Sequence, residues 1–332
     1  MKPFLYIRPK NLKEAIDAVS FHPQASFIAG GTNLLDLMKR GLAFPEKLVD
    51  INHLPLKKIE QKRGILRIGA LALNSDVARH KLVNDQHPLL VQAINEGASG
   101  QLRNMATTGG NLLQQTRCPY FYDTAFPCNR RQPGSGCSAV NGINRHHAIF
   151  GVDEGDPDQS CIAVHSSDMS VALVALDAEI VIAGQNGERK VPLTGLYRAP
   201  GNRPNLSANL DKGELITAVE IPDSRYGKNV HYLKVRDRAS YAFALVSAAV
   251  ALDMRGNSIS SASISLGGVA YMPWRLPTVE KFLTGQPAND ALFKQAADMS
   301  VAGARPFKHN AYKVKLVRNV IYESLKTAAG IA

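Results

Sequence analysis

The sequence of 332 residues lacks the long apolar segments of membrane-spanning and exported chains. Its start, residues 1–6, contains no apolar stretch of the kind that forms the core of a secretory signal. The longest apolar run extends from Ala242 to Leu252 and falls well short of the roughly 20 residues that span a bilayer. We therefore expect a chain with no membrane span and no signal of its own.

Familiar nucleotide-binding and nucleic-acid-binding motifs are also missing. The sequence contains no G-x-G-x-x-G and no Walker pattern, so it supports neither a Rossmann fingerprint nor an NTPase loop. The net charge is +11, from 39 Lys and Arg against 28 Asp and Glu, but the basic residues are scattered and not interleaved with aromatic ones. No nucleic-acid-binding motif accompanies them, so we expect no nucleic-acid partner, and an acidic protein partner explains the charge better.

The composition is otherwise that of a globular protein, with 45% apolar and 20% charged residues, and the length suits two or three domains. Apolar periodicity and capping residues predict helices over residues 11–19, 34–40, 76–83 (capped by Ser75), 88–98, 168–177, 278–283, 290–301 and 311–328. Short apolar runs predict strands over residues 27–29, 47–51, 64–70, 178–183, 213–222, 231–235, 242–254 and 259–269.

Two glycine pairs are the first candidate binding elements. Gly30-Gly31 lies between a predicted strand and a predicted helix, and Gly109-Gly110 lies in the turn Thr107–Asn111. Glycine lets a backbone approach a phosphate closely, and a following helix start directs N–H groups at it. Each pair alone is more often a plain turn. Together, beside Thr and Asn donors, they could hold the two phosphates of one dinucleotide.

The four cysteines, Cys118, Cys128, Cys137 and Cys161, all lie between the second glycine pair and Asp168. This clustering indicates a metal centre, because grouped thiolates select zinc or iron–sulfur. The spacing contains no C-x-x-C knuckle and by itself leaves both metals open, with unligated thiols as a third alternative. The nearby histidines (His146, His147 and His165) are expected at the surface or in hydrogen bonds and not as ligands.

Three segments together resemble the FAD-binding medium subunits of the xanthine dehydrogenase family of molybdenum hydroxylases. They are Ala29–Leu34, Gln101–Asn104 with Thr107–Asn111, and Asp168 ahead of Ala172–Ala178. The likeness covers essentially the whole chain and implies an α+β fold. Its expected parts are a two-part FAD-binding domain of the vanillyl-alcohol-oxidase-like type at residues 1–224 and a smaller C-terminal α+β domain at residues 229–330, as in carbon monoxide dehydrogenase flavoproteins.

The chain departs from this family between Asn111 and Asp168, where a separation of 57 positions replaces a short connection. The insertion, at about residues 114–163, carries all four cysteines. Within the family, the flavoprotein subunits of 4-hydroxybenzoyl-CoA reductase and of bacterial periplasmic aldehyde oxidoreductase carry a [4Fe-4S] cluster in such an insertion. Gln114–Asp123, Pro133–Cys137 and Val235–Ser247 resemble the aldehyde oxidoreductase.

The resemblance implies two cofactors, FAD and a [4Fe-4S] cluster, and no catalytic residue in this chain. It places Ile216 and Lys234 near the flavin, where a cation would stabilise the anionic reduced form. The expected FAD-binding residues are Phe27, Ile28, Ala29, Gly30, Gly31, Thr32, Asn33, Leu34, Leu35, Thr107, Thr108, Gly109, Gly110, Asn111, Asp168, Ile216 and Lys234. The expected cluster ligands are Cys118, Cys128, Cys137 and Cys161.

The function implied is that of the FAD- and [4Fe-4S]-containing electron-transfer subunit of a heterotrimeric molybdenum-dependent aldehyde oxidoreductase. Its expected partners are a [2Fe-2S] subunit, a large molybdenum-cofactor subunit that oxidises aldehydes to carboxylic acids, and an external acceptor such as an acidic redox protein. Two alternatives stay open: a 4-hydroxybenzoyl-CoA reductase-like flavoprotein with reversed electron flow, and a non-catalytic, zinc-stabilised binding module. The expected location is the periplasm, by co-export with a partner that carries a twin-arginine signal, with the cytoplasm as the alternative.

Overall fold

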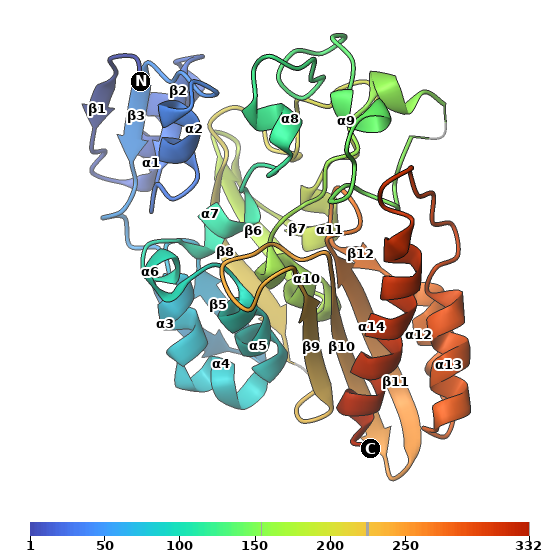
Figure 1. Ribbon diagram of the computed structural model, residues 1–332. Helices are drawn as coiled ribbons and strands as arrows, with labels where there is room; N and C mark the ends of the chain where they lie inside the picture. Colours follow the sequence, from blue (N-terminus) through green and yellow to red (C-terminus); the bar gives the residue numbers. More distant parts are fainter. Residues whose placement is uncertain (154, 224–225, 332) are drawn as a thin grey trace.

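A computed structural model describes residues 1–153, 155–223 and 226–331 of the chain, and the expected domain boundary at residue 224 lies outside these residues. They form an N-terminal unit, a central unit, an insertion and a C-terminal unit (Figure 1). The first, second and last of these are built on sheets of three, five and four strands. None of the helices in these residues combines the length and the apolar character needed to cross a membrane.

The N-terminal unit is a small parallel sheet in the order β1-β3-β2 with two helices. Its elements are β1 (Leu5–Ile7), α1 (Leu12–Ser20), β2 (Ala25–Ile28), α2 (Leu34–Lys39) and β3 (Lys47–Asp50). The α1 helix begins where Asn11 accepts a hydrogen bond from the Glu14 N–H, so the predicted cap is confirmed. Ala15 and Val19 on α1 pack on Val49 of β3 in a separate small core.

The central unit is an antiparallel sheet in the order β4-β5-β8-β6-β7, with helices on one side. The strands are β4 (Ile59–Lys62), β5 (Ile65–Gly69), β6 (Glu179–Gly184), β7 (Gly187–Pro192) and β8 (Leu215–Pro222). The helices are α3 (Asn74–Arg79), α4 (Lys81–Gln86), α5 (Pro88–Glu96), α6 (Gly100–Arg103), α7 (Thr108–Leu112), α10 (Asp168–Ala175) and α11 (Leu193–Leu196). Every residue of α10 is buried, as its nearly uniform apolar sequence requires.

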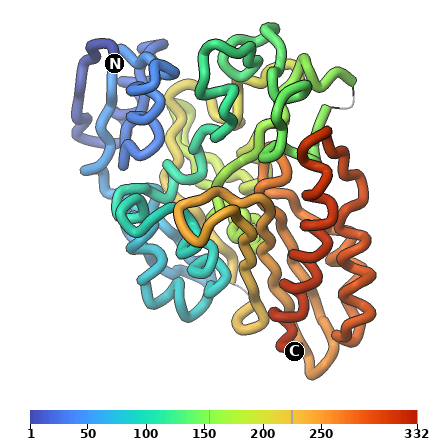
Figure 2. The backbone as a smooth tube through the Cα atoms, viewed as in Figure 1, coloured from blue at the N-terminus to red at the C-terminus, as the bar shows by residue number. Residues whose placement is uncertain are grey.

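The insertion is mostly irregular chain, with α8 (Pro119–Tyr122), α9 (Ser138–Asn141) and the 3₁₀ turn η1 (Pro157–Gln159). Figure 2 shows its long loops above the central unit. Phe121 and Cys128 of the insertion pack against Leu37 of α2, so the insertion also contacts the N-terminal unit.

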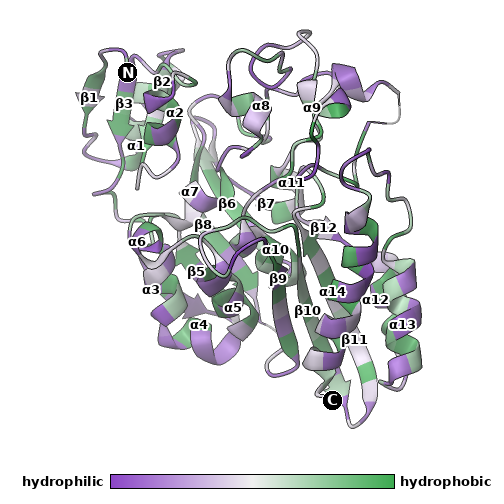
Figure 3. Ribbon diagram, viewed as in Figure 1, coloured by the Kyte–Doolittle hydropathy of each residue, from purple (hydrophilic) through white to green (hydrophobic). Residues whose placement is uncertain are grey.

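The C-terminal unit is an antiparallel sheet in the order β12-β11-β10-β9, followed in the chain by three helices. Its elements are β9 (Val230–Val235), β10 (Val246–Arg255), β11 (Ser258–Gly267), β12 (Trp274–Arg275), α12 (Pro277–Leu283), α13 (Asp290–Met299) and α14 (Tyr312–Ala329). The helix α14 packs on β9 and β10, and α10 of the central unit packs on β10 and β11. The sheet is therefore covered on both faces, which explains why β10 is hydrophobic along most of its length (Figure 3).

Three local expectations were wrong. Ser75 lies inside α3 and does not cap it, because a β-bridge between Leu73 and Thr107 starts the helix at Asn74. The helix predicted over residues 76–83 is split into α3 and α4 by the extended backbone of His80, whose ψ is 129°. The strand predicted from Ala242 begins only at Val246, since the preceding loop contains Tyr241 with a φ of 51°.

Candidate functional site

A cleft of about 1740 Å³ lies between the N-terminal unit, the central unit and the insertion. Both glycine segments contribute to its wall, together with Ile216 of β8 and Lys234 of β9. From the insertion come the cations Arg117, Arg130 and Arg131. Pockets for drug-sized ligands measure about 300–1,000 Å³, so this larger cleft has room for a dinucleotide.

Most of the residues that the sequence assigned to FAD binding line this cleft. They are Phe27, Ile28, Ala29, Gly30, Gly31, Thr32, Asn33, Leu34, Thr107, Gly109, Gly110, Asn111, Asp168, Ile216 and Lys234. Leu35 and Thr108 are not among the lining residues. The side chain of Leu35 packs under Gly31, and buried Thr108 donates a hydrogen bond from Oγ1 to the Ala72 carbonyl (3.0 Å). The contacts of all these residues with FAD stay predictions.

The first glycine segment needs both of its glycines, for different reasons. Gly31 has a φ of 71°, which L side chains rarely adopt. A methyl group on Gly30 would overlap the backbone of Met105, which comes just before the second glycine segment. Gly30 therefore allows the two segments to lie against each other.

The second glycine segment is a short helix, α7, where the sequence suggested a turn. Thr107 caps it by accepting a hydrogen bond from the Gly110 N–H (3.2 Å), and this cap folds the glycines into a helical turn. Gly109 donates its N–H to Ala70 (2.8 Å) and lies close to Ile216. The glycines keep this wall of the cleft free of side chains.

Asn33 links the first segment to the start of the insertion, because its Oδ1 accepts a hydrogen bond from the Gln115 N–H (2.9 Å). The Nδ2 group of Asn33 is buried and finds no partner among the described residues. Buried amide groups normally make hydrogen bonds, so this donor beside the cleft is available to a ligand. The glycine walls and this unused donor fit a phosphate-bearing cofactor such as FAD.

Asp168 and Lys234 both line the cleft and form a buried ion pair, with 2.8 Å between Oδ2 and Nζ. The Lys234 ammonium also donates to the Glu96 carbonyl (2.9 Å), and Tyr232 donates to Asp168 Oδ1 (2.7 Å). Burial raises the pKa of Asp168, and the charge of Lys234 opposes that rise. Lys234 is thus a cation whose charge is paired with Asp168.

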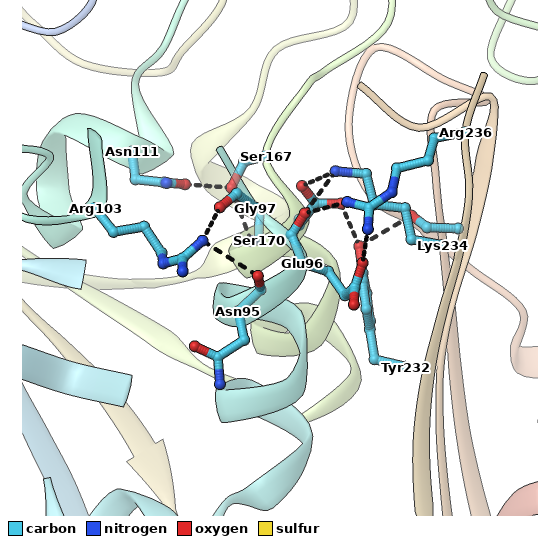
Figure 4. Close-up of polar contacts among 12 residues, drawn as sticks. Asn95, Glu96, Gly97, Arg103, Asn111, Ser167, Ser170, Tyr232, Lys234 and Arg236 are labelled. Carbon is cyan, nitrogen blue, oxygen red and sulfur yellow. Dashed lines mark hydrogen bonds and ion pairs between the residues drawn. The ribbon is translucent and has the colours of Figure 1, made fainter. Parts of the chain in front are cut away.

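A second polar chain links α7 to the start of α10, although the insertion separates them in sequence. Ser167 caps α10 and donates to Asn111 Oδ1 (2.5 Å) (Figure 4). Ser170 bonds with Ser167, Tyr197 and His165, at 2.8 to 3.2 Å. The insertion therefore leaves and returns beside the same wall of the cleft.

The four cysteines are free thiols that the fold gathers into one neighbourhood. The backbones of Cys128 and Cys137 form an isolated antiparallel β-bridge. The cysteines are close enough to interact electrostatically. Cys161 raises the pKa of Cys118 and Cys137, and Cys128 raises the pKa of Cys118 and Cys161. Across the described ranges, no three His, Cys, Asp or Glu side chains are placed to hold a single metal ion. The cluster assigned from the sequence stays a prediction.

Burial makes these thiols harder to deprotonate, and a nearby cation partly offsets that effect. Burial raises the pKa of Cys118 to about 12, and it also raises the pKa of Cys137 and of Cys161. Arg130 opposes the shift at Cys161 by its charge and a hydrogen bond. Bound thiolates need such compensation, since metal binding displaces thiol protons. Four sulfur donors beside a cation are a donor set suited to iron–sulfur or zinc.

His147 belongs to this cysteine centre, which the sequence did not indicate. Its side chain is buried, and its Nε2 lies 3.1 Å from Cys118 Sγ. Burial lowers the pKa of His147 to about 4 and that of His165 to about 3. His146 is exposed, as expected. No sequence signal separates the two adjacent histidines, because the difference depends on packing against distant residues.

Comparison with known proteins adds family relationships to this geometry. The pattern of the FAD binding domain in molybdopterin dehydrogenase matches residues 2–224, and that of the CO dehydrogenase flavoprotein C-terminal domain matches residues 231–328. The chain is 47% identical over 332 residues to the aldehyde oxidoreductase FAD-binding subunit PaoB of Escherichia coli (strain K12), covering 99% of each chain.

More distant relatives share the full length and the fold. The chain is 27% identical to the glyceraldehyde dehydrogenase medium chain of Sulfolobus acidocaldarius, covering 98% of each. Among solved structures, it matches a chain of carbon monoxide dehydrogenase from Hydrogenophaga pseudoflava with a TM-score of 0.76 and 25% identity, covering 99% of this chain and 98% of that one. The predicted α+β fold of these flavoproteins is confirmed.

Proposed function

The chain belongs to the FAD-binding subunits of the molybdenum hydroxylase family, and we propose that it serves a molybdenum-dependent aldehyde oxidoreductase as an electron-transfer subunit. Membership in a family of oxidoreductase subunits removes the non-catalytic binding module from consideration. The proposal of aldehydes as substrates is supported by the full-length similarity to an aldehyde oxidoreductase subunit.

The observation that carries the FAD assignment is the convergence of two glycine segments on one large cleft. Gly31, Gly109 and Gly110 leave the backbone accessible, and Asn33 offers an unused donor. We assign the pyrophosphate to the first glycine segment at the start of α2, since backbone N–H groups at helix starts bind phosphate. The N–H groups of Gly109 and Gly110 already donate to Ala70 and Thr107, so these glycines contribute an open wall. We assign the isoalloxazine to the part of the cleft that the buried Asp168–Lys234 pair lines. FAD supplies the redox chemistry, and the chain supplies binding and orientation.

We also propose a [4Fe-4S] cluster on Cys118, Cys128, Cys137 and Cys161. Their gathering in one buried neighbourhood and the cation Arg130 support this assignment. In a cubane each thiolate binds a different iron, so the four sulfurs need not converge on one point, as they must for zinc. The centre also orders an insertion that has little regular secondary structure.

The direction of electron flow that we propose is from a [2Fe-2S] subunit, through this subunit, to an external acceptor. Hydroxylation of the aldehyde takes place on a separate molybdenum subunit, which makes the complex a heterotrimer. The related chains are named for dehydrogenases and hydroxylases, which favours oxidation over the reversed flow of a thioester reductase. The net charge of +11 suits an acidic acceptor protein.

Periplasmic location by co-export with a partner that carries a twin-arginine signal is part of the proposal. Fractionation of cells that produce the complex, with and without a functional twin-arginine pathway, tests it. We expect this chain to stay in the cytoplasm only when the pathway is blocked. Cytoplasmic recovery in both strains would contradict it.

The experiment that tests the function is anaerobic reduction of the purified complex by an aldehyde. Bleaching of the flavin absorbance within turnover time is expected, followed by recovery on addition of an acceptor. A matched complex whose molybdenum subunit lacks its cofactor should bleach with dithionite but not with aldehyde. A flavin that aldehydes leave oxidised in the intact complex, while dithionite reduces it, would contradict the proposed electron flow.

A further inference from the structure

His147 is the only histidine in the described part of the chain for which the structure gives a contact with a cysteine sulfur. Its Nε2 lies 3.1 Å from Cys118 Sγ, within hydrogen-bonding distance for sulfur. Its other ring nitrogen, Nδ1, is buried and has no partner among the described residues. The ring therefore makes its one polar contact with the sulfur.

The C-terminal unit fixes the backbone of this histidine. The His147 carbonyl accepts hydrogen bonds from Asn310 Nδ2 (3.2 Å) and from Lys313 Nζ (3.0 Å). Its N–H donates to the carbonyl of Asn144 (3.0 Å). Asn310 and Lys313 are both fully buried at the start of α14. The ring is consequently held toward Cys118 by contacts that do not involve the cysteines themselves.

The chemistry of the sulfur decides which atom carries the hydrogen. A thiol can donate or accept, but a metal-bound thiolate has no hydrogen and can only accept. The hydrogen must then lie on Nε2, whatever the protonation of Nδ1. The contact becomes an N–H···S hydrogen bond when Cys118 binds iron.

We propose that His147 is a positioning residue that donates a hydrogen bond to the Cys118 thiolate and raises the reduction potential of the [4Fe-4S] cluster, an inference that rests on the proposed cluster. Reduction adds negative charge to the cluster and its sulfurs. A donor aimed at one sulfur stabilises this charge more in the reduced state than in the oxidised one. Hydrogen bonds to the sulfurs are among the factors that set cluster potentials.

The test is an EPR-monitored redox titration of the intact complex carrying His147→Leu, His147→Gln or His146→Leu. Leucine removes the donor, glutamine keeps an N–H donor, and His146 is the exposed neighbour that serves as control. The expected result is a more negative cluster potential in His147→Leu, a smaller shift in His147→Gln and none in His146→Leu. The FAD potential should stay unchanged in all three.

An unchanged cluster potential in an iron-replete His147→Leu complex would overturn the inference. If His147→Leu fails to retain iron, pulsed EPR of the reduced wild-type complex with ¹⁵N-labelled histidine decides. A histidine nitrogen coupled to the cluster, lost in His147→Gln, supports the hydrogen bond, and no coupling refutes it. A wild-type complex without iron in this subunit would instead refute the proposed cluster, so the two failures are distinguishable.

Discussion

Gly30 offers a direct test of the idea that the two glycine segments form one cofactor site. In Gly30→Ala the new methyl group would overlap the backbone of Met105, so the two segments must move apart. A backbone cannot turn aside as a flexible side chain can. Overpacking of this kind costs about 1–3 kcal/mol, which corresponds to a loss of FAD affinity of about 5-fold to about 160-fold if separated segments bind the cofactor poorly.

Gly100→Ala is the matched control, because the same change there meets no atom within 4 Å. Alanine also favours the helix α6 that Gly100 begins. The assay is a titration of the deflavinated complex with FAD, followed by flavin fluorescence. We expect weaker binding only in Gly30→Ala. Wild-type affinity in a folded Gly30→Ala complex would refute the reasoning that close contact of the two segments creates the site.

Three further predictions follow from buried groups. Asp168→Asn leaves Lys234, whose side chain is 1% exposed, without its counter-charge. The free energy of unfolding should fall by about 3–5 kcal/mol, with a lower thermal midpoint and a lower FAD content. Adding Lys234→Met should restore part of this loss. Burial lowers the pKa of His87 to about 4, so below its ordinary value of 6.5 the unfolded chain binds the proton first. The free energy of unfolding should then fall by about 1.4 kcal/mol for each pH unit as the pH is lowered from 6.5 to about 4. His87→Leu should make the free energy of unfolding, measured by chemical unfolding, less dependent on pH in this range. Cys128→Ser should lower the yield of assembled complex or its FAD content but leave the ranking of aldehydes by kcat/KM unchanged; a changed ranking at full cofactor content would show that the insertion shapes substrate choice.

The sequence identified the glycine segments because their chemistry is local. Gly31 shows why: its φ of 71° favours glycine through the residue's own backbone, without reference to distant neighbours. Family resemblance supplied Asp168 and Lys234 as site residues, but not their pairing. The two are 66 positions apart, and no periodicity or spacing encodes such a contact.

Other features escaped prediction because they depend on neighbours distant in sequence. The edge strand β7 is largely exposed and rich in charge, so only its pairing with β6 makes it a strand. The helical form of α7 depends on the Thr107 cap, which looks like an ordinary loop threonine in the sequence. His147 differs from His146 only through its burial against α14 and the cysteines.

The central claim is that this subunit holds both FAD and a [4Fe-4S] cluster. Its most direct test is metal and flavin analysis of the purified complex, with the partner's [2Fe-2S] iron counted separately by EPR spin quantification. The account predicts about one FAD and about four additional irons per chain, with matching acid-labile sulfide. One zinc per chain, with no iron beyond that of the [2Fe-2S] clusters, would contradict it.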